Sequence, residues 1–141
     1  MNGTARISHR CDHIGILTNN AGALLNFYTE KMDFIHEKEE ILSSSVFEKI
    51  FGFAVDCRFI RLSAGDFMLE LFEPARRSAC MRTAEMTGLN HFGYCVKNRR
   101  DYVDRLRKKN VGIIEVKRDS HTVYFVSDPD GNRIEIRECA T

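Results

Sequence analysis

An internal repeat restricts the fold of this chain more than any other feature. Each half holds one stretch built around a His and one built around a Glu: D-H-I-G-I-L at 12–17 matches N-H-F-G-Y-C at 90–95, and F-M-L-E-L-F-E at 67–73 matches N-R-I-E-I-R-E at 132–138. The spacing between the Glu stretches is about 13 residues shorter than that between the His stretches, so the first half carries an insertion. The sequence therefore predicts two copies of one structural module.

Alternating apolar and polar residues, separated by turn formers, predict a strand, a helix and three strands in each half. The first half has expected strands at 11–18, 34–41, 58–62 and 67–72 and a helix at 23–32; the second has strands at 90–96, 113–117, 122–126 and 133–137 and a helix at 99–109. We expect an α+β fold of two βαβββ modules in a single domain, residues 1–141. Module one covers about 11–74, a linker about 75–88, and module two about 89–138.

The insertion in the first half predicts a short additional helix in V-F-E-K-I-F-G. Ser45 and Glu48 have the spacing of a capping box, and Gly52 suits the end of the helix. Phe47 and Phe51 belong to its apolar face, which needs a packing partner because a two-turn helix is marginal alone. Two alternatives follow: the helix packs against the core, or it covers a substrate pocket as a lid.

The repeated His and Glu residues share one property, which is that each lies on the strand face opposite the apolar one. These candidate metal ligands are His13, Glu70, His91 and Glu135. Two imidazoles and two carboxylates suit one divalent transition metal ion such as Ni, Co, Zn, Fe or Mn, with positions left for water or substrate. The alternative is that all four are solvent-facing residues of a duplicated sheet.

The same strand faces provide further candidate pocket residues. Leu17, Met68 and Phe72 alternate with or follow the candidate ligands, and Phe47 and Phe51 join them if the inserted helix is a lid. Arg133 and Arg137 flank Glu135 on its face. We expect these arginines either to bind a carboxylate or phosphate of the substrate or to be charges at the rim of the site.

Composition and charge exclude several classes of partner. The 141 residues are 43% hydrophobic and carry a net charge of +1, so neither nucleic acid nor an anionic membrane is an expected partner. Five cysteines without a C-x-x-C pair suit free thiols in a reducing compartment. The N-terminal stretch lacks an apolar signal region, and we expect a cytoplasmic protein that acts on a small molecule.

With these motifs, the chain resembles the vicinal oxygen chelate superfamily, which includes glyoxalase I, methylmalonyl-CoA epimerase, extradiol dioxygenases and the fosfomycin and bleomycin resistance proteins. The resemblance runs from about Cys11 to Glu138. It implies that paired βαβββ modules curl into a cup-shaped mixed sheet around one metal ion, commonly in a homodimer. It also implies that the four candidate ligands occupy the four ligand positions of glyoxalase I.

Two departures from glyoxalase I concern the substrate. That family usually has an Arg four residues after its first ligand His and an Asn four residues after its first ligand Glu, both contacting glutathione; here these positions are Leu17 and Pro74. These two departures argue against glutathione as the substrate, and whether glutathione or CoA is involved stays open. Glu70 departs from the extradiol dioxygenases and from the metal-free bleomycin-binding type, whereas an acyl-CoA epimerase stays an open alternative.

The chemistry implied by the resemblance is isomerase or lyase chemistry of the glyoxalase kind. A metal ion that holds two vicinal substrate oxygens stabilises an enediolate or enolate as it forms, and a carboxylate beside the metal moves the proton. Glu135 is the first candidate for the base and Glu70 the second. The alternative from another class is a non-catalytic protein that binds or sequesters a small molecule in the cup.

Overall fold

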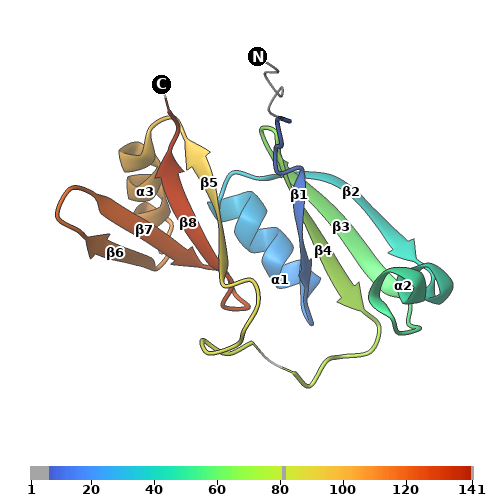
Figure 1. The fold of residues 1–141 in the computed structure, drawn as a ribbon. Coiled ribbons are helices and arrows are strands. Elements are labelled where there is room, and N and C mark those ends of the chain that lie inside the picture. The colour runs from blue at the N-terminus through green and yellow to red at the C-terminus, as the bar shows by residue number, and fades with distance from the viewer. Residues whose placement is uncertain (1–6, 81, 141) are drawn as a thin grey trace, which may run out of the picture.

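Each half of the chain forms a four-stranded mixed sheet, and the computed structural model describes residues 7–80 and 82–140. The elements of the first half are β1 (His13–Leu17), α1 (Ala21–Asn26), the π-helical turn η1 (Phe27–Lys31), β2 (Ile35–Leu42), α2 (Ser44–Phe51), β3 (Cys57–Ala64) and β4 (Phe67–Pro74) (Figure 1). Those of the second half are β5 (His91–Val96), α3 (Arg99–Lys108), β6 (Ile113–Lys117), β7 (Thr122–Ser127) and β8 (Arg133–Glu138). The predicted α+β fold of two βαβββ modules is confirmed.

Both sheets have the same topology, with strand orders β1-β4-β3-β2 and β5-β8-β7-β6. The first and last strands of each module run parallel, and the other pairs are antiparallel. This register places Gly15 opposite Glu70 and Gly93 opposite Glu135. A Cβ atom at Gly93 would lie 3.2 Å from the Glu135 carbonyl oxygen, so glycine avoids a tight contact between β5 and β8.

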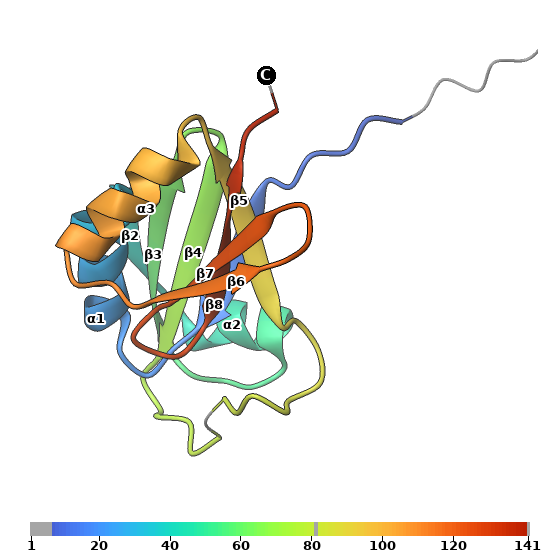
Figure 2. The same cartoon turned by 90° about the vertical axis from the view of Figure 1, so that its left-hand side faces the viewer.

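One hydrophobic core joins the two modules. Figure 2 shows α1 and α3 on one side of the strands and α2 on the other. The helices and the apolar faces of both sheets supply the buried residues, among them Ile16, Leu24, Tyr28, Leu69, Leu71, Phe92, Tyr102, Leu106, Ile134 and Ile136. The predicted apolar faces are therefore confirmed, and the opposite faces of both sheets carry the candidate site.

A buried carboxylate connects the β7–β8 turn of module two to module one. The Tyr28 hydroxyl donates to Asp128 Oδ2 at 2.7 Å, and Thr18 Oγ1 donates to Asp130 Oδ2 at 2.5 Å. Within the turn, the backbone N–H groups of Asp130 and Asn132 both donate to Asp128 Oδ1. Burial raises the pKa of the Asp128 carboxyl, although these donors oppose the shift.

The inserted helix α2 forms as predicted, but the capping box expected at Ser45 is wrong. The N-cap is Ser43, and its side chain makes no capping hydrogen bond. Asp56, from the segment after the helix, instead accepts a hydrogen bond from the Ser44 N–H at 2.8 Å and so satisfies one of the helix's first donors. Gly52 ends the helix with φ of 85°, in agreement with the prediction.

Helix α2 packs on the face of its sheet that carries Glu70. Phe47 is fully buried in a small cluster with Cys57, Phe59 and Phe72. Phe51, on the other hand, is 39% exposed, and its ring centroid lies 5.0 Å from that of Phe72. The helix thus has one residue in a packed core and one at the edge of the ligand-bearing face. Over the described ranges, no helix is long and apolar enough to span a membrane.

Candidate functional site

His13 and Glu70 form the first of two matched pairs. His13 begins β1 and Glu70 lies in the middle of the neighbouring strand β4, and His13 Nε2 is 3.6 Å from Glu70 Oε2. Gly15, directly opposite Glu70, has no side chain to fill the space beside the imidazole. The Glu70 side chain is 12% exposed whereas that of His13 is 47% exposed, so the carboxylate is held by the sheet and the imidazole is open to solvent.

His91 and Glu135 form the second pair with nearly the same geometry. His91 begins β5 and Glu135 lies on the neighbouring β8, and His91 Nε2 is 3.7 Å from Glu135 Oε2. Gly93 again lies opposite the glutamate. The edge of the Phe125 ring packs against the imidazole, with centroids 5.2 Å apart. The sequence repeat therefore corresponds to a repeated arrangement of side-chain atoms.

The residue before each histidine orients its ring. His13 Nδ1 lies 2.8 Å from Asp12 Oδ2, and His91 Nδ1 lies 2.8 Å from Asn90 Oδ1. An acceptor at Nδ1 holds the ring proton there and leaves the Nε2 lone pair free, which is the arrangement found around metal-ligating histidines. The sequence reasoning did not include Asp12 and Asn90, although their position in the repeat was a usable signal.

An arginine holds one oxygen of each glutamate. Arg61 donates to Glu70 Oε1 through Nη2 at 2.9 Å and through Nε at 3.3 Å. Arg137 donates to Glu135 Oε1 through one bond of 3.3 Å. In both pairs the second oxygen, Oε2, therefore faces the histidine. Arg61 was also missing from the predicted site.

The four predicted ligands lie as two pairs and not as one group of four. Within residues 7–80 and 82–140, no three His, Cys, Asp or Glu side chains come together as a set of metal ligands. Each pair offers one nitrogen and one oxygen, which is a suitable donor set for a transition metal but only half of a coordination shell. A single chain thus presents two half-sites.

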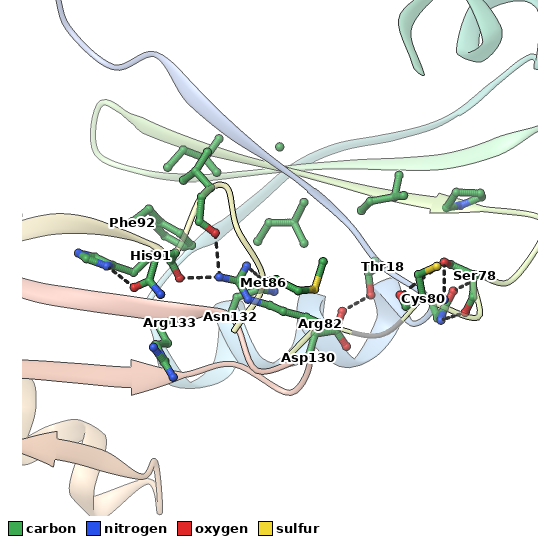
Figure 3. Close-up of a pocket in the computed structure, with 18 of the residues that line it drawn as sticks. Thr18, Ser78, Cys80, Arg82, Met86, His91, Phe92, Asp130, Asn132 and Arg133 are labelled. Carbon is green, nitrogen blue, oxygen red and sulfur yellow. Dashed lines mark hydrogen bonds between the residues drawn. The ribbon is translucent and has the colours of Figure 1, made fainter. Parts of the chain in front are cut away.

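A cavity of about 560 Å³ lies between β1, the loop after β4, the start of β5 and the β7–β8 turn (Figure 3). Its volume is in the range of small-molecule sites. Leu17 and Arg133, both predicted pocket residues, line it together with His91. The lining does not include the other predicted pocket residues, which are Phe47, Phe51, Met68, Phe72 and Arg137. Met68 lines a separate cavity of about 500 Å³ together with Asp12 and Arg61.

The two arginines nearest the second half-site differ in their partners. Arg137 is bound to Glu135, as described above. Arg133 lies opposite His91 in the sheet register and is half-buried, and its side chain has no hydrogen bond or ion pair with any described residue. Another lining residue, Arg82, is engaged: its guanidinium donates to the Leu89 carbonyl oxygen at 2.9 Å. Arg133 is therefore the cation beside His91 that is available to a ligand.

Comparison with known proteins identifies the family. Residues 10–136 match the model of the Glyoxalase/Bleomycin resistance protein/Dioxygenase superfamily, so the chain belongs to this superfamily. No curated protein sequence is recognisably similar to it.

Solved structures share the fold over nearly the whole chain. A glyoxalase family protein from Enterococcus faecalis is 25% identical with a TM-score of 0.69, covering 92% of this chain and 97% of its own. The trypanothione-dependent glyoxalase I of Leishmania major is 19% identical with a TM-score of 0.65, covering 93% and 87%. TnmS3, an antibiotic-binding protein from Streptomyces sp. CB03234, is 16% identical with a TM-score of 0.64, covering 96% and 99%. The same fold therefore occurs in an enzyme and in a binding protein.

Proposed function

We propose that the protein is a metal-dependent isomerase or lyase of the glyoxalase type, acting on a small oxygenated substrate. The observation that carries this proposal is the repeated half-site: His Nε2 faces Glu Oε2 in both modules, and the remaining polar atoms of both side chains are already held by neighbours. A merely solvated sheet face gives no reason for this arrangement to occur twice.

Both half-sites are needed to hold a metal ion. Catalytic zinc sites typically have three protein ligands, so a pair with two donors is insufficient alone. The combined set of His13, Glu70, His91 and Glu135 would supply two nitrogens and two carboxylates to one ion of Ni, Co, Zn, Fe or Mn. We propose that a homodimer joins them, the first pair of one chain meeting the second pair of the other.

The bound ion would act as a Lewis acid that stabilises an enediolate or enolate. The chain itself supplies the proton transfer and the orientation of the site. Glu135 is favoured as the base because Arg137 holds its Oε1 by one long bond, whereas Arg61 holds Glu70 by two. A carboxylate with fewer bonds is freer to move toward a substrate proton.

The cavity beside His91 indicates the kind of substrate. Leu17 and Phe92 give it an apolar wall, and Arg133, whose guanidinium is not paired with any residue of 7–80 or 82–140, provides a cation at its edge. This combination favours a substrate with an apolar part and an anionic group. Because Leu17 and Pro74 replace the polar residues with which glyoxalase I contacts glutathione, we propose a substrate other than glutathione.

A second candidate function is small-molecule binding without turnover. The observation in its favour is the cavity of about 560 Å³, which is lined mainly by residues outside the two His–Glu pairs, among them Phe53, Met86 and Leu89. In this alternative the cavity is the functional site and the His–Glu pairs contribute only to the sheet.

Metal analysis and isotope exchange together test the proposal. Protein purified without added metal should contain a stoichiometric transition metal ion. A panel of α-hydroxythioesters, 2-methyl-branched acyl-CoA esters and hydroxyketones should then be incubated in deuterium oxide. Exchange of the proton next to the carbonyl that stops on chelation supports the enzyme, whereas exchange that continues unchanged contradicts the metal mechanism. A stoichiometric bound ligand in metal-free protein would favour the binding alternative.

A further inference from the structure

Cys95 and Cys139 form a contact between thiols that the proposed function does not use. Cys95 lies on β5 and Cys139 directly follows β8, and their Sγ atoms are 2.7 Å apart although 44 residues separate them in sequence. The contact is fixed by the backbone, because the Cys139 N–H donates to the Val96 carbonyl oxygen at 2.9 Å. Folding therefore brings these two sulfurs together.

The surroundings of the pair permit reaction with solutes. Cys95 is exposed and Cys139 is half-buried, so both sulfurs are accessible to a small oxidant. The Cys139 thiol donates its hydrogen to the sulfur of Cys95, and this hydrogen bond is the main reason that the pKa of Cys139 is raised. Cys139 is thus the donor of the pair, and Cys95, the more exposed of the two, is the sulfur placed to act as a nucleophile.

The other cysteines lack these properties. Cys57 is buried, and burial raises its pKa to about 11. Cys11 and Cys80 are exposed, but within the described part of the chain neither contacts a second cysteine. Within the described part of the chain, solvent access and contact with a second thiol are therefore combined at Cys95 and Cys139.

We propose that Cys95 and Cys139 are a redox-active dithiol that hydrogen peroxide converts reversibly into an intramolecular disulfide. The Cys95 thiolate attacks one peroxide oxygen and the O–O bond breaks, giving a sulfenic acid and, after proton transfer, water. Cys139 then attacks the Cys95 sulfur, the S–O bond breaks, and its proton leaves with the hydroxide as a second water. The two thiols lose two electrons and two protons, and peroxide is reduced to two molecules of water.

The pair lies on the same sheet face as the second half-site. Cys95 follows His91 and Gly93 at alternate positions of β5, and Cys139, the residue directly after β8, continues the alternation of Glu135 and Arg137. A disulfide here would link β5 covalently to the end of β8. The proposal does not depend on metal binding or turnover, because it rests only on the two thiols and their contact.

Thiol counting after mild oxidation tests the proposal. The folded chain, treated with a small excess of hydrogen peroxide and then denatured and alkylated with iodoacetamide, should have three alkylated cysteines in place of five, because denaturation also makes the buried Cys57 accessible. Trypsin should release the peptide that ends at Lys97 linked to the peptide that follows Arg137. Dithiothreitol should restore all five reactive thiols by disulfide exchange. The same treatment in concentrated urea should not favour this pairing, since the contact is made by the fold.

Matched variants separate the pair from general cysteine oxidation. Cys95→Ser and Cys139→Ser should each abolish the protected pair, whereas Cys80→Ser, which removes an exposed cysteine outside the pair, should leave it intact. Oxidation of Cys11 or Cys80 before the pair, a linkage between two chains, or irreversible oxidation of Cys95 with Cys139 unprotected would each overturn the proposal.

Discussion

Arg61 and Phe125 occupy equivalent positions of the two modules, each directly across the sheet from the glutamate of its half-site. Arg61 lies opposite Glu70 on β3, and Phe125 lies opposite Glu135 on β7. The residues two positions after the glutamates are reversed, with Phe72 in module one and Arg137 in module two. Each half-site therefore has one arginine and one phenylalanine beside its glutamate. In module one, Arg61 reaches Glu70 from the neighbouring strand β3, whereas in module two Arg137 reaches Glu135 from the same strand, β8.

Replacing the residue before a ligand histidine should weaken metal binding without removing a ligand. Asp12→Ala frees the Nδ1 atom of His13, and we expect metal affinity to fall by about 10- to 100-fold. Asp12→Asn should stay close to the parent, because Asn90 performs the same role beside His91. Competition with a chromophoric chelator measures both affinities. Equal losses in the two variants would show that charge and not orientation matters.

Mixing two inactive variants tests whether the half-sites meet between chains. His13→Ala and His91→Ala should each lose the metal. The two variants are then unfolded and refolded together. If the sites lie between the chains of a two-fold dimer, half of the dimers are mixed, and each mixed dimer has one intact site of its two. The mixture should therefore recover about one quarter of the parental metal content. Recovery should be absent if each site forms within one chain. Metal content after gel filtration is the readout.

Two phenylalanines of α2 should differ in their effect on stability. Phe47 is fully buried, so Phe47→Ala should lower the free energy of unfolding by about 3–5 kcal/mol. Phe51 is partly exposed, and Phe51→Ala should lower it by only about 1–2 kcal/mol. Urea denaturation of both variants provides the comparison. A larger loss for Phe51→Ala would mean that the helix packs differently from the arrangement described above.

The unpaired Arg133 should discriminate between charged and neutral ligands. Octanoate and octanamide have the same apolar chain, and titration calorimetry in the presence of a chelator can compare their binding to the cavity. Arg133→Gln should weaken octanoate binding by about 10-fold or more and leave octanamide nearly unchanged. Arg100→Gln, on the exposed side of α3, is the control with no expected effect. An equal loss for both ligands would argue against a charge interaction.

The buried Asp128 should produce a defined pH dependence. Its pKa is raised in the folded state, so its contribution to stability is complete below its unfolded pKa of about 3.9 and is lost as pH rises through the folded pKa. Asp128→Asn does not titrate at this position. Its free energy of unfolding relative to the parent should therefore increase as pH rises from about 3.9 through the raised pKa of Asp128. Urea titrations at several pH values measure this difference, and a flat profile would contradict it.

The repeat and the strand parity were sufficient to predict the modules, because alternation of apolar residues fixes which face of a strand meets the core. The repeat and the alternation did not predict the residues at which the helices begin. The Ala21 N–H donates to Glu73 Oε2 and the Ser44 N–H to Asp56 Oδ1, and such partners are brought close only by the fold. The observed start of α1 accordingly precedes the predicted one by two residues.

For the site, the alternation of residues along the strands placed all four candidate ligands on the sheet faces opposite the core. It could not predict how the two His–Glu pairs lie relative to each other. That depends on how one module packs against the other, and packing is determined by the apolar side chains of the shared core and not by the ligand side chains. The orientation of the histidines was readable in principle, since D-H and N-H occupy matching positions of the repeat. The opposite arrangement of Arg61 and Arg137 had no such signal, because the two residues are not equivalent in the repeat.

The hydrogen bond between Tyr28 and Asp128 also affects how the protein folds as it is synthesised. The two residues are 100 positions apart, and a ribosome adding about 5–20 residues per second needs roughly 5–20 s to pass from one to the other. During that interval module one has emerged, but the Tyr28 hydroxyl has no carboxylate and its apolar surface has no second module to cover it. The newly made first half therefore exposes apolar surface that the finished protein buries, and such surface favours aggregation.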